Sequence, residues 1–135
     1  MAFVVSFDRL VDYDQSRPGI TITIELKLGR SSISVPVKID TGSTHCLFTR
    51  SVGEQLNIDI EAGERLTVST VTGSFLSFGH WVTLVSEGFE FDSMIFFAAD
   101  DSVGRNVLGR FGWLDRIIVG INDYDGILYL RSHDE

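Results

Sequence analysis

Apolar and polar residues alternate with a period of two along much of this chain, which is the pattern of half-buried β-strands. In residues 19–29 isoleucine alternates with threonine, and in residues 32–40 isoleucine and valine alternate with other residues. The segment Gly-Arg-Ser-Ser at 29–32 separates them, so the sequence predicts a hairpin. Pro36 has no N–H to donate, which predicts an outer or irregular position for the second strand.

The later part of the chain repeats this alternation. Further strands are predicted at residues 65–71, 74–86, 89–99, 116–122 and 126–132. Thr72 and Gly73 separate the first two of these strands, so we expect a long hairpin with its tip there. The segment Asp-Tyr-Asp-Gly at 123–126 predicts a tight turn between the last two.

Helical signals are few. Residues 49–57 predict two turns of helix, with Thr49 as the N-cap and Leu56 facing inward. Residues 110–116 predict one or two more turns, although Gly112 is a poor helix former. The predicted fold class is therefore all-β, with many short strands, one or two short helices and one protruding hairpin.

Length and composition describe one globular domain. The chain has 135 residues, of which 44% are apolar and 22% are charged. No apolar stretch reaches the roughly 18 residues of a spanning helix, and the N-terminus lacks the basic start of a signal peptide. We expect a soluble protein, with the cytoplasm favoured, or a soluble domain of a longer or membrane-anchored protein. The net charge of −8 argues against a nucleic-acid partner.

Residues with metal-binding or redox chemistry are sparse. Cys46 is the single cysteine, which excludes an internal disulfide and a cysteine-rich zinc site. His45, His80 and His133 are far apart in sequence, and no two have the spacing of metal ligands. The chain contains neither a Gly-x-Ser-x-Gly elbow nor a Gly-x-x-x-x-Gly-Lys loop. We therefore expect no metal and no cofactor.

Asp40 ends an apolar strand and is followed at once by Thr41, Gly42, Ser43 and Thr44. A glycine in this place lets a substrate backbone come close because no Cβ intervenes. The hydroxyl groups can hydrogen-bond and orient a carboxylate. The same residues also suit an ordinary turn after a strand. Asp40 is therefore either a turn residue or a catalytic carboxylate.

Two strings of residues carry a family resemblance. The apolar-apolar-Asp-Thr-Gly-Ser-Thr string around Asp40 resembles the active-site motif of aspartic proteases. A second string at 106–110, which contains Leu108, Gly109 and Arg110, resembles the apolar-apolar-Gly-Arg segment of the retropepsins, the single-lobe members of retroviral type. The order of the motifs is also similar, and the resemblance covers residues 19–131. The details are similar to a cellular, bacterial-type protein rather than to a virus-encoded one.

The resemblance implies a retropepsin-like closed β-barrel that works as a homodimer and hydrolyses peptides or proteins. The chain contains one Asp-Thr-Gly, whereas the chemistry needs two carboxylates, so each subunit would contribute one Asp40. Thr41 matches the residue whose hydroxyl reaches across the two-fold axis, and Gly42 would present its carbonyl to the substrate main chain. Ser43 is implied to hydrogen-bond the outer carboxylate oxygen, with Thr44 as a further supporting residue.

The hairpin at 66–85 corresponds to the flap that closes over substrate in these enzymes. The residues implied to bind substrate there are Val71, Thr72, Gly73, Ser74 and Phe75. Val71 and Phe75 are candidate pocket walls and favour cleavage beside bulky apolar residues. Phe75 can equally pack the flap onto its own domain.

Two features depart from the viral enzymes. Thr44 takes the place of an aspartate that pairs with the late arginine, so Arg110 lacks its usual partner and is not assigned to substrate binding. Residues 1–18 precede the protease domain at 19–135 and are predicted as an N-terminal extension. Within it the segment 2–7, Ala-Phe-Val-Val-Ser-Phe, is either a strand at the dimer interface or part of a segment that self-cleavage removes.

Three functions are compatible with these residues. The first is an active aspartic endopeptidase, and the second is a catalytically silent dimer of the same fold that acts as a protein-interaction module. The third is an unrelated ligand-binding β-barrel with Asp40 in a turn, against which the late Gly-Arg segment argues. We expect the first because Asp40, Gly42 and the neighbouring hydroxyls are all present.

Overall fold

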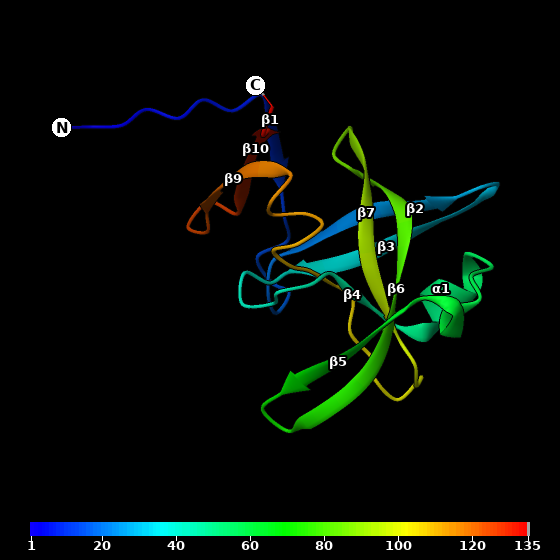
Figure 1. The fold of residues 1–135 in the computed structure, drawn as a ribbon. Helices are drawn as coiled ribbons and strands as arrows, with labels where there is room; N and C mark the ends of the chain where they lie inside the picture. The colour runs from blue at the N-terminus through cyan, green and yellow to red at the C-terminus, as the bar shows by residue number, and fades with distance from the viewer. Residues whose placement is uncertain (135) are drawn as a thin grey trace.

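The computed structural model describes residues 1–134, which form strands, one short α-helix and one turn of 3₁₀-helix (Figure 1). The elements are β1 (Arg9–Asp12), β2 (Thr21–Leu28), β3 (Ser31–Ile39), β4 (Leu47–Phe48), α1 (Arg50–Gln55), η1 (Ile60–Ala62), β5 (Glu64–Thr70), β6 (Gly73–Ser86), β7 (Phe89–Ala98), β8 (Val107–Leu108), β9 (Ile117–Asn122) and β10 (Ile127–Ser132). The predicted all-β class is confirmed.

Six strands close into a barrel in the order β2-β3-β8-β4-β7-β6, because β6 also pairs with β2. The closing contact is antiparallel and places Leu26 opposite Leu84. Closure removes the open edges that a flat sheet would leave, so nearly every strand of the barrel finds partners on both sides. Pro36 lies in the part of β3 that pairs with β2 alone, since β8 reaches only Lys38 and Ile39.

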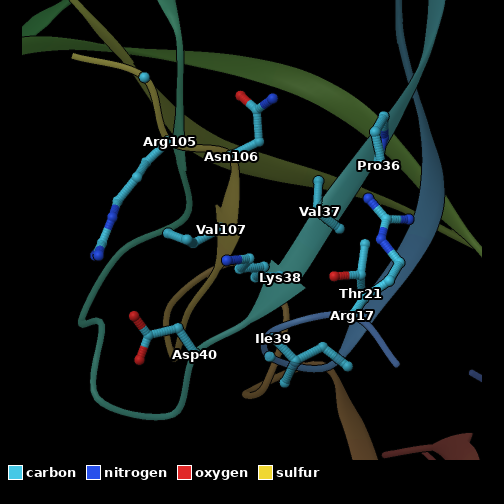
Figure 2. Close-up of a pocket in the computed structure, with 12 residues that line it drawn as sticks. Arg17, Thr21, Pro36, Val37, Lys38, Ile39, Asp40, Arg105, Asn106 and Val107 are labelled. Atoms are coloured by element: carbon cyan, nitrogen blue, oxygen red, sulfur yellow. The ribbon is translucent and has the colours of Figure 1, made fainter. Parts of the chain in front are cut away.

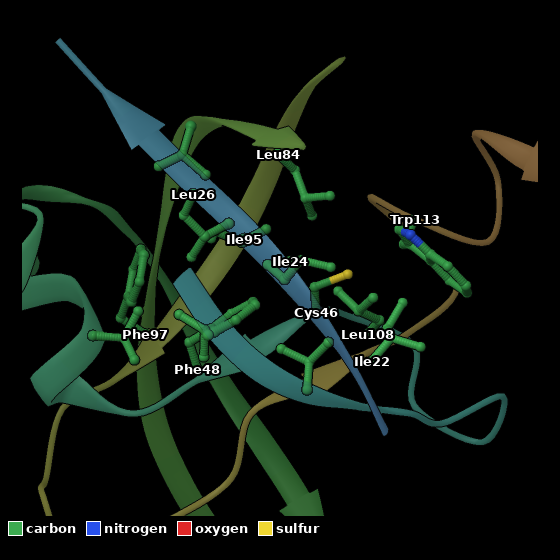
Figure 3. Packing of buried hydrophobic residues seen from close by; sticks show 14 of the residues in the cluster. Ile22, Ile24, Leu26, Cys46, Phe48, Leu84, Ile95, Phe97, Leu108 and Trp113 are labelled. Atoms are coloured by element: carbon green, nitrogen blue, oxygen red, sulfur yellow. The ribbon is translucent and has the colours of Figure 1, made fainter. Parts of the chain in front are cut away.

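The barrel encloses a single apolar core, which follows from the period-two alternation. On β2, for example, Ile22, Ile24 and Leu26 are at most 5% exposed, whereas Thr23 is exposed and Glu25 is partly exposed. Figure 3 shows these side chains packed with residues of the neighbouring elements. The other labelled members of this cluster are Cys46, Phe48, Leu84, Ile95, Phe97, Leu108 and Trp113.

The β5–β6 hairpin projects from the barrel (Figure 1). Within the described residues β5 pairs only with β6, whose second half continues into the barrel. The predicted long hairpin is confirmed, with its tip one residue earlier than expected. Gly73 already pairs with Thr70, and the Thr70 hydroxyl donates to the Gly73 carbonyl at 2.9 Å, so Val71 and Thr72 form the turn.

A second, three-stranded sheet has the order β1-β10-β9. β1 comes from the predicted N-terminal extension, and Tyr13 directly after it is buried and donates a hydrogen bond to Asp123. Residues 2–7 contain no strand, and in Figure 1 this end of the chain runs away from the domain. Phe3, Val4 and Val5 are exposed. A role for this segment at a dimer interface stays a prediction.

The predicted helix at 49–57 is confirmed as α1, with the expected cap. The Thr49 hydroxyl accepts a hydrogen bond from the Val52 N–H at 3.4 Å, and Leu56 is buried. The helix ends at Gln55 with Leu56 as its C-cap, and Asn57 beyond it has a left-handed φ of 60°. Within residues 1–134 no helix has both the length and the apolar character that crossing a membrane requires.

The predicted helix at 110–116 is wrong, because this segment is a series of turns. Gly112 has a φ of 105°, which no residue of a right-handed helix adopts. Its N–H donates to the Asp115 carboxylate at 3.0 Å instead of joining a helical ladder. The turns place Trp113 in the core, fully buried.

Candidate active site

Asp40 follows β3 directly and is held to the neighbouring strand. Its N–H donates to the Leu108 carbonyl at 2.9 Å, which continues the pairing of β3 with β8. The chain then turns sharply, since the Ser43 N–H donates to the Asp40 carbonyl at 3.1 Å. The Gly42 N–H donates to Asp40 Oδ1 at 2.9 Å. These bonds orient the carboxylate on a loop whose next residues, Thr41 and Gly42, are exposed.

Ser43 does not play the part that the resemblance implies. Its hydroxyl donates to the His45 carbonyl at 2.6 Å rather than to Asp40. The Gly42 backbone N–H, which the sequence analysis did not single out for this purpose, holds the carboxylate instead. Ser43 therefore stiffens the loop, and Thr44 beside it is exposed.

The two sequence motifs meet in space. The Arg110 N–H donates to the Ser43 carbonyl and the Phe111 N–H to the Thr44 carbonyl, both at 2.9 Å. Gly109 lies so close to the same loop that a Cβ on it would be 2.3 Å from the His45 carbonyl oxygen. Any side chain at Gly109 would push the loop away, which explains why the Leu-Gly-Arg string has glycine at this position.

Cys46 supports this junction from the barrel interior, a role that the sequence analysis missed. The Gly109 N–H points at the Cys46 sulfur at 3.4 Å, and the thiol points at the Phe111 carbonyl at 3.5 Å. Cys46 is fully buried, and burial raises the pKa of its thiol to about 11. A single cysteine between His45 and Leu47 gives no indication of such a contact in the sequence.

His45 and Arg110 lie at the outer side of the loop. The His45 ring contacts the rings of Phe96 and Phe111, with centroid separations of 4.8 and 5.8 Å, and its burial lowers its pKa. The Arg110 guanidinium lies over the Phe111 ring at 5.5 Å. Within residues 1–134 Arg110 forms no ion pair.

The tip of the β5–β6 hairpin faces the loop at 103–105. The two segments line a cavity of about 560 Å³. Val71 at the tip is fully exposed, and Phe75 is partly buried. The loop at 103–105 also borders the cavity that contains Asp40, so it connects the hairpin tip with the carboxylate.

The cavity beside Asp40 has a volume of about 370 Å³ (Figure 2). Its walls include Val37, Ile39 and Val107, and also three basic side chains, Arg17, Lys38 and Arg105. Sequence analysis singled out none of these basic residues, although Lys38 and Arg105 adjoin the two motifs. In the part of the chain that the structure describes, no group of three or more histidine, cysteine, aspartate or glutamate side chains is placed to hold a metal.

Solved structures share this architecture. A retropepsin-like aspartic protease from Rickettsia conorii superposes with a TM-score of 0.65, at 16% identity over 91% of this chain and 97% of that one. The EIAV protease complexed with the inhibitor HBY-793 superposes with a TM-score of 0.57, at 20% identity over 74% of this chain and 88% of that one. The chain has the retropepsin fold. No protein-family model matches the sequence, and no curated protein matches it.

The retropepsin fold confirms the predicted architecture and brings the two motifs together. In it the predicted residues fall into two groups that the loop at 103–105 connects. Asp40, Thr41, Gly42, Ser43 and Thr44 form the loop that rests on Leu108, Gly109 and Arg110, whereas Val71, Thr72, Gly73, Ser74 and Phe75 form the hairpin tip.

Proposed function

We propose that this chain is one subunit of a homodimeric aspartic endopeptidase whose reactive pair consists of Asp40 from each subunit. The observation that carries the proposal is the junction between the Asp40 loop and the Leu108–Arg110 segment. Four backbone hydrogen bonds and one side-chain-to-backbone bond fix a single carboxylate at the exposed end of a barrel strand. An ordinary turn residue needs no such support from a distant segment.

The dimer follows from the number of carboxylates. In aspartic proteases two carboxylates about 3 Å apart share one proton, because two like charges at that distance cannot both persist. The chain has one Asp-Thr-Gly, since Asp92 and Asp101 are followed by serine and not by Thr-Gly. A symmetric pair of subunits brings two copies of one residue together on its axis.

Because the pair shares one proton, one Asp40 is ionised and the other is protonated, and the reaction uses both forms. The ionised Asp40 takes a proton from water as the water oxygen attacks the carbonyl carbon of the substrate. The protonated Asp40 of the other subunit donates its proton to the carbonyl oxygen, which gives a neutral tetrahedral diol. The Asp40 that took the proton from water then gives it to the leaving nitrogen, a hydroxyl of the diol returns its proton to the other Asp40, and the C–N bond breaks. The dyad again holds one proton.

Neighbouring residues take supporting roles in this proposal. The exposed Thr41 hydroxyl reaches across the two-fold axis and stiffens the paired loops, and the Gly42 carbonyl receives the substrate main chain. The β5–β6 hairpin acts as the flap, in which the residues 71–75 cover the substrate and exclude water. Its place opposite the loop at 103–105 supports this role.

A mixing experiment tests the shared dyad. Wild-type chain and Asp40→Asn chain are refolded together in equal amounts, and cleavage of a peptide library is measured from about pH 3 to about pH 7. If each active site needs Asp40 from both subunits, random pairing leaves about half of the activity per wild-type chain. A monomeric catalyst would lose none of its activity. Asp40→Asn alone should cleave nothing.

Sedimentation of both proteins provides the control, because the variant must still form dimers for the mixing result to count. A wild-type protein that remains monomeric at assay concentration would contradict the proposal. So would cleavage that survives in Asp40→Asn, or a stable wild-type dimer that cleaves no peptide in the library. Inhibition by a statine-type transition-state analogue is the expected additional result.

A further inference from the structure

The walls of the cavity beside Asp40 are more basic than the chain as a whole. Arg17, Lys38 and Arg105 line it, and among residues 1–134 Asp40 is its only carboxylate. The whole chain carries 19 acidic and 11 basic residues, so basic side chains are in the minority. Three of the eleven around one cavity, against one carboxylate, make a local positive field on an acidic protein. Figure 2 shows the three side chains around this cavity.

Within residues 1–134 these three side chains form no ion pair, in contrast to four of the other basic residues. Among residues 1–134, Arg17, Lys38 and Arg105 have no carboxylate within 4 Å. Elsewhere Arg9, Lys27, Arg50 and Arg116 each have such a partner. Hydrogen bonds from Ser16 and, to a smaller extent, the charge of Arg17 lower the pKa of Asp14, so part of the Arg17 charge acts on that carboxylate. Lys38 and Arg105 leave their charge available to a ligand in the cavity.

Each of the three cations comes from a different segment. Lys38 is on β3 two residues before Asp40, and its stem lies against Gly19, where a Cβ would be 3.2 Å from it. Arg105 belongs to the loop that leads into β8, and Arg17 belongs to the loop before β2. Thr21 also lines the cavity, and its buried hydroxyl has no hydrogen-bond partner in the described part of the chain.

We propose that this cavity binds the acidic side chain of a substrate residue next to the cleaved bond, so that the enzyme prefers glutamate or aspartate there. The inference rests on the proposed protease function, because Asp40 in the wall of the cavity puts its contents beside the reacting carbonyl. The volume of about 370 Å³ is within the range of roughly 300–1,000 Å³ that ligand sites have. It replaces the expectation of bulky apolar residues, which rested on Val71 and Phe75 alone.

Symmetry extends the preference to both sides of the bond. A homodimer with two-fold symmetry has two copies of the cavity, one beside each Asp40. The substrate chain runs through the axis, so one cavity receives the residue before the cleaved bond and the other receives the residue after it. A peptide with acidic residues at both positions should therefore have a higher kcat/KM than a peptide with an acidic residue at one position.

The test compares peptides that differ only in the residues flanking the cleaved bond, as glutamate, glutamine, leucine or lysine. We expect kcat/KM for the glutamate peptide to exceed that for the glutamine peptide by about tenfold near pH 5.5, where glutamate, with a pKa of about 4.3, is ionised. The ratio should fall towards one below about pH 4, where that side chain is protonated, and should also fall at high salt, which screens the charges.

Variants assign the preference to the cavity. Lys38→Gln and Arg105→Gln should each lower the glutamate-to-glutamine ratio by about fivefold, and Arg105→Glu should turn the preference towards lysine. Arg30→Gln is the matched control, because Arg30 also has no ion pair in residues 1–134 but lies at the distant β2–β3 turn. It should leave the ratio unchanged. Equal ratios in all variants, or a loss of dimers in place of a change of ratio, would overturn the inference.

Binding separates this inference from the proposed function. Asp40→Asn protein is titrated with the uncleaved glutamate and glutamine peptides, each carrying a fluorophore, and anisotropy is recorded. Tighter binding of the glutamate peptide that disappears in the Lys38→Gln background supports the cavity even if wild-type protein cleaves nothing. Cleavage without any preference for acidic residues would agree with the proposed protease function and would contradict the proposed specificity of the cavity.

Discussion

Replacing Gly109 by alanine adds one methyl group where the two motifs meet. The new Cβ would be 2.3 Å from the His45 carbonyl oxygen and 2.5 Å from the Ser43 carbonyl oxygen. Real Cβ atoms essentially never approach another heavy atom closer than 3.0 Å, so the nearer oxygen has to move by at least about 0.7 Å. Both oxygens belong to the backbone, which cannot swing aside as a flexible side chain can.

The cost can be worked from these contacts. Overpacking a tight site usually costs about 1–3 kcal/mol. The displacement also stretches the bonds that Arg110 and Phe111 donate to the loop, and each lost hydrogen bond costs about 0.5–1.5 kcal/mol. We therefore expect Gly109→Ala to lower the free energy of unfolding by about 3 kcal/mol or more. Because the loop carries Asp40, peptide cleavage should also fall steeply.

Urea unfolding followed by tryptophan fluorescence measures this change, since Trp113 is fully buried in the native protein. The Asp40→Asn background prevents self-cleavage, and the subunit concentration is kept constant because dimer stability depends on it. Gly104→Ala is the matched control, since a Cβ at Gly104 would meet nothing within 4 Å. If Gly109→Ala and Gly104→Ala unfold within about 0.5 kcal/mol of each other, the close contact does not matter and the reasoning is refuted.

Three further predictions concern residues outside the dyad. Thr49→Ala should lower the free energy of unfolding by about 1 kcal/mol in urea titrations, because it removes the acceptor for the Val52 N–H; no change would contradict the cap. The hydrogen bond to Asp123 raises the pKa of Tyr13 to about 12, whereas a tyrosine in the unfolded chain has a pKa of about 10. Between these two pH values Tyr13 keeps its proton in the native state and loses it in the unfolded state. Stability should therefore fall as the pH rises from about 10 to about 12, and Tyr13→Phe should flatten this part of the curve. The buried thiol of Cys46, with its pKa of about 11, should react with a disulfide reagent at about pH 8 only after unfolding, and equal labelling rates in native and unfolded protein would show that it is accessible.

The elements that could be predicted from sequence are those that depend on neighbours in the chain. The alternation in β2 and β3 is enough to predict strands, because any strand with one face in a core shows it. The Thr49 cap and the turn at 123–126 use side chains and backbone angles within a few residues. The Asp40 loop was also predictable, since its residues are consecutive.

The failures concern contacts that the local sequence pattern does not predict, and most of these contacts join distant segments. The segment 110–116 has enough apolar residues for a helix, but its start is held by the Asp40 loop and Gly112 adopts a left-handed φ. The Ser43 hydroxyl finds the His45 carbonyl because the loop curls over Gly109. The pairing of β2 with β6, which closes the barrel, joins residues about sixty positions apart.

By itself the sequence determined the strand pattern, the α1 cap and the candidate carboxylate at Asp40, because hydrophobic periodicity, capping and turn chemistry act over a few residues. Only the tertiary structure decided that Gly109 supports the Asp40 loop and that the hairpin tip faces the loop at 103–105. It also decided that Arg17, Lys38 and Arg105 gather in one cavity. Local patterns carry no information on which distant side chains meet, because that depends on how the closed barrel brings its loops together.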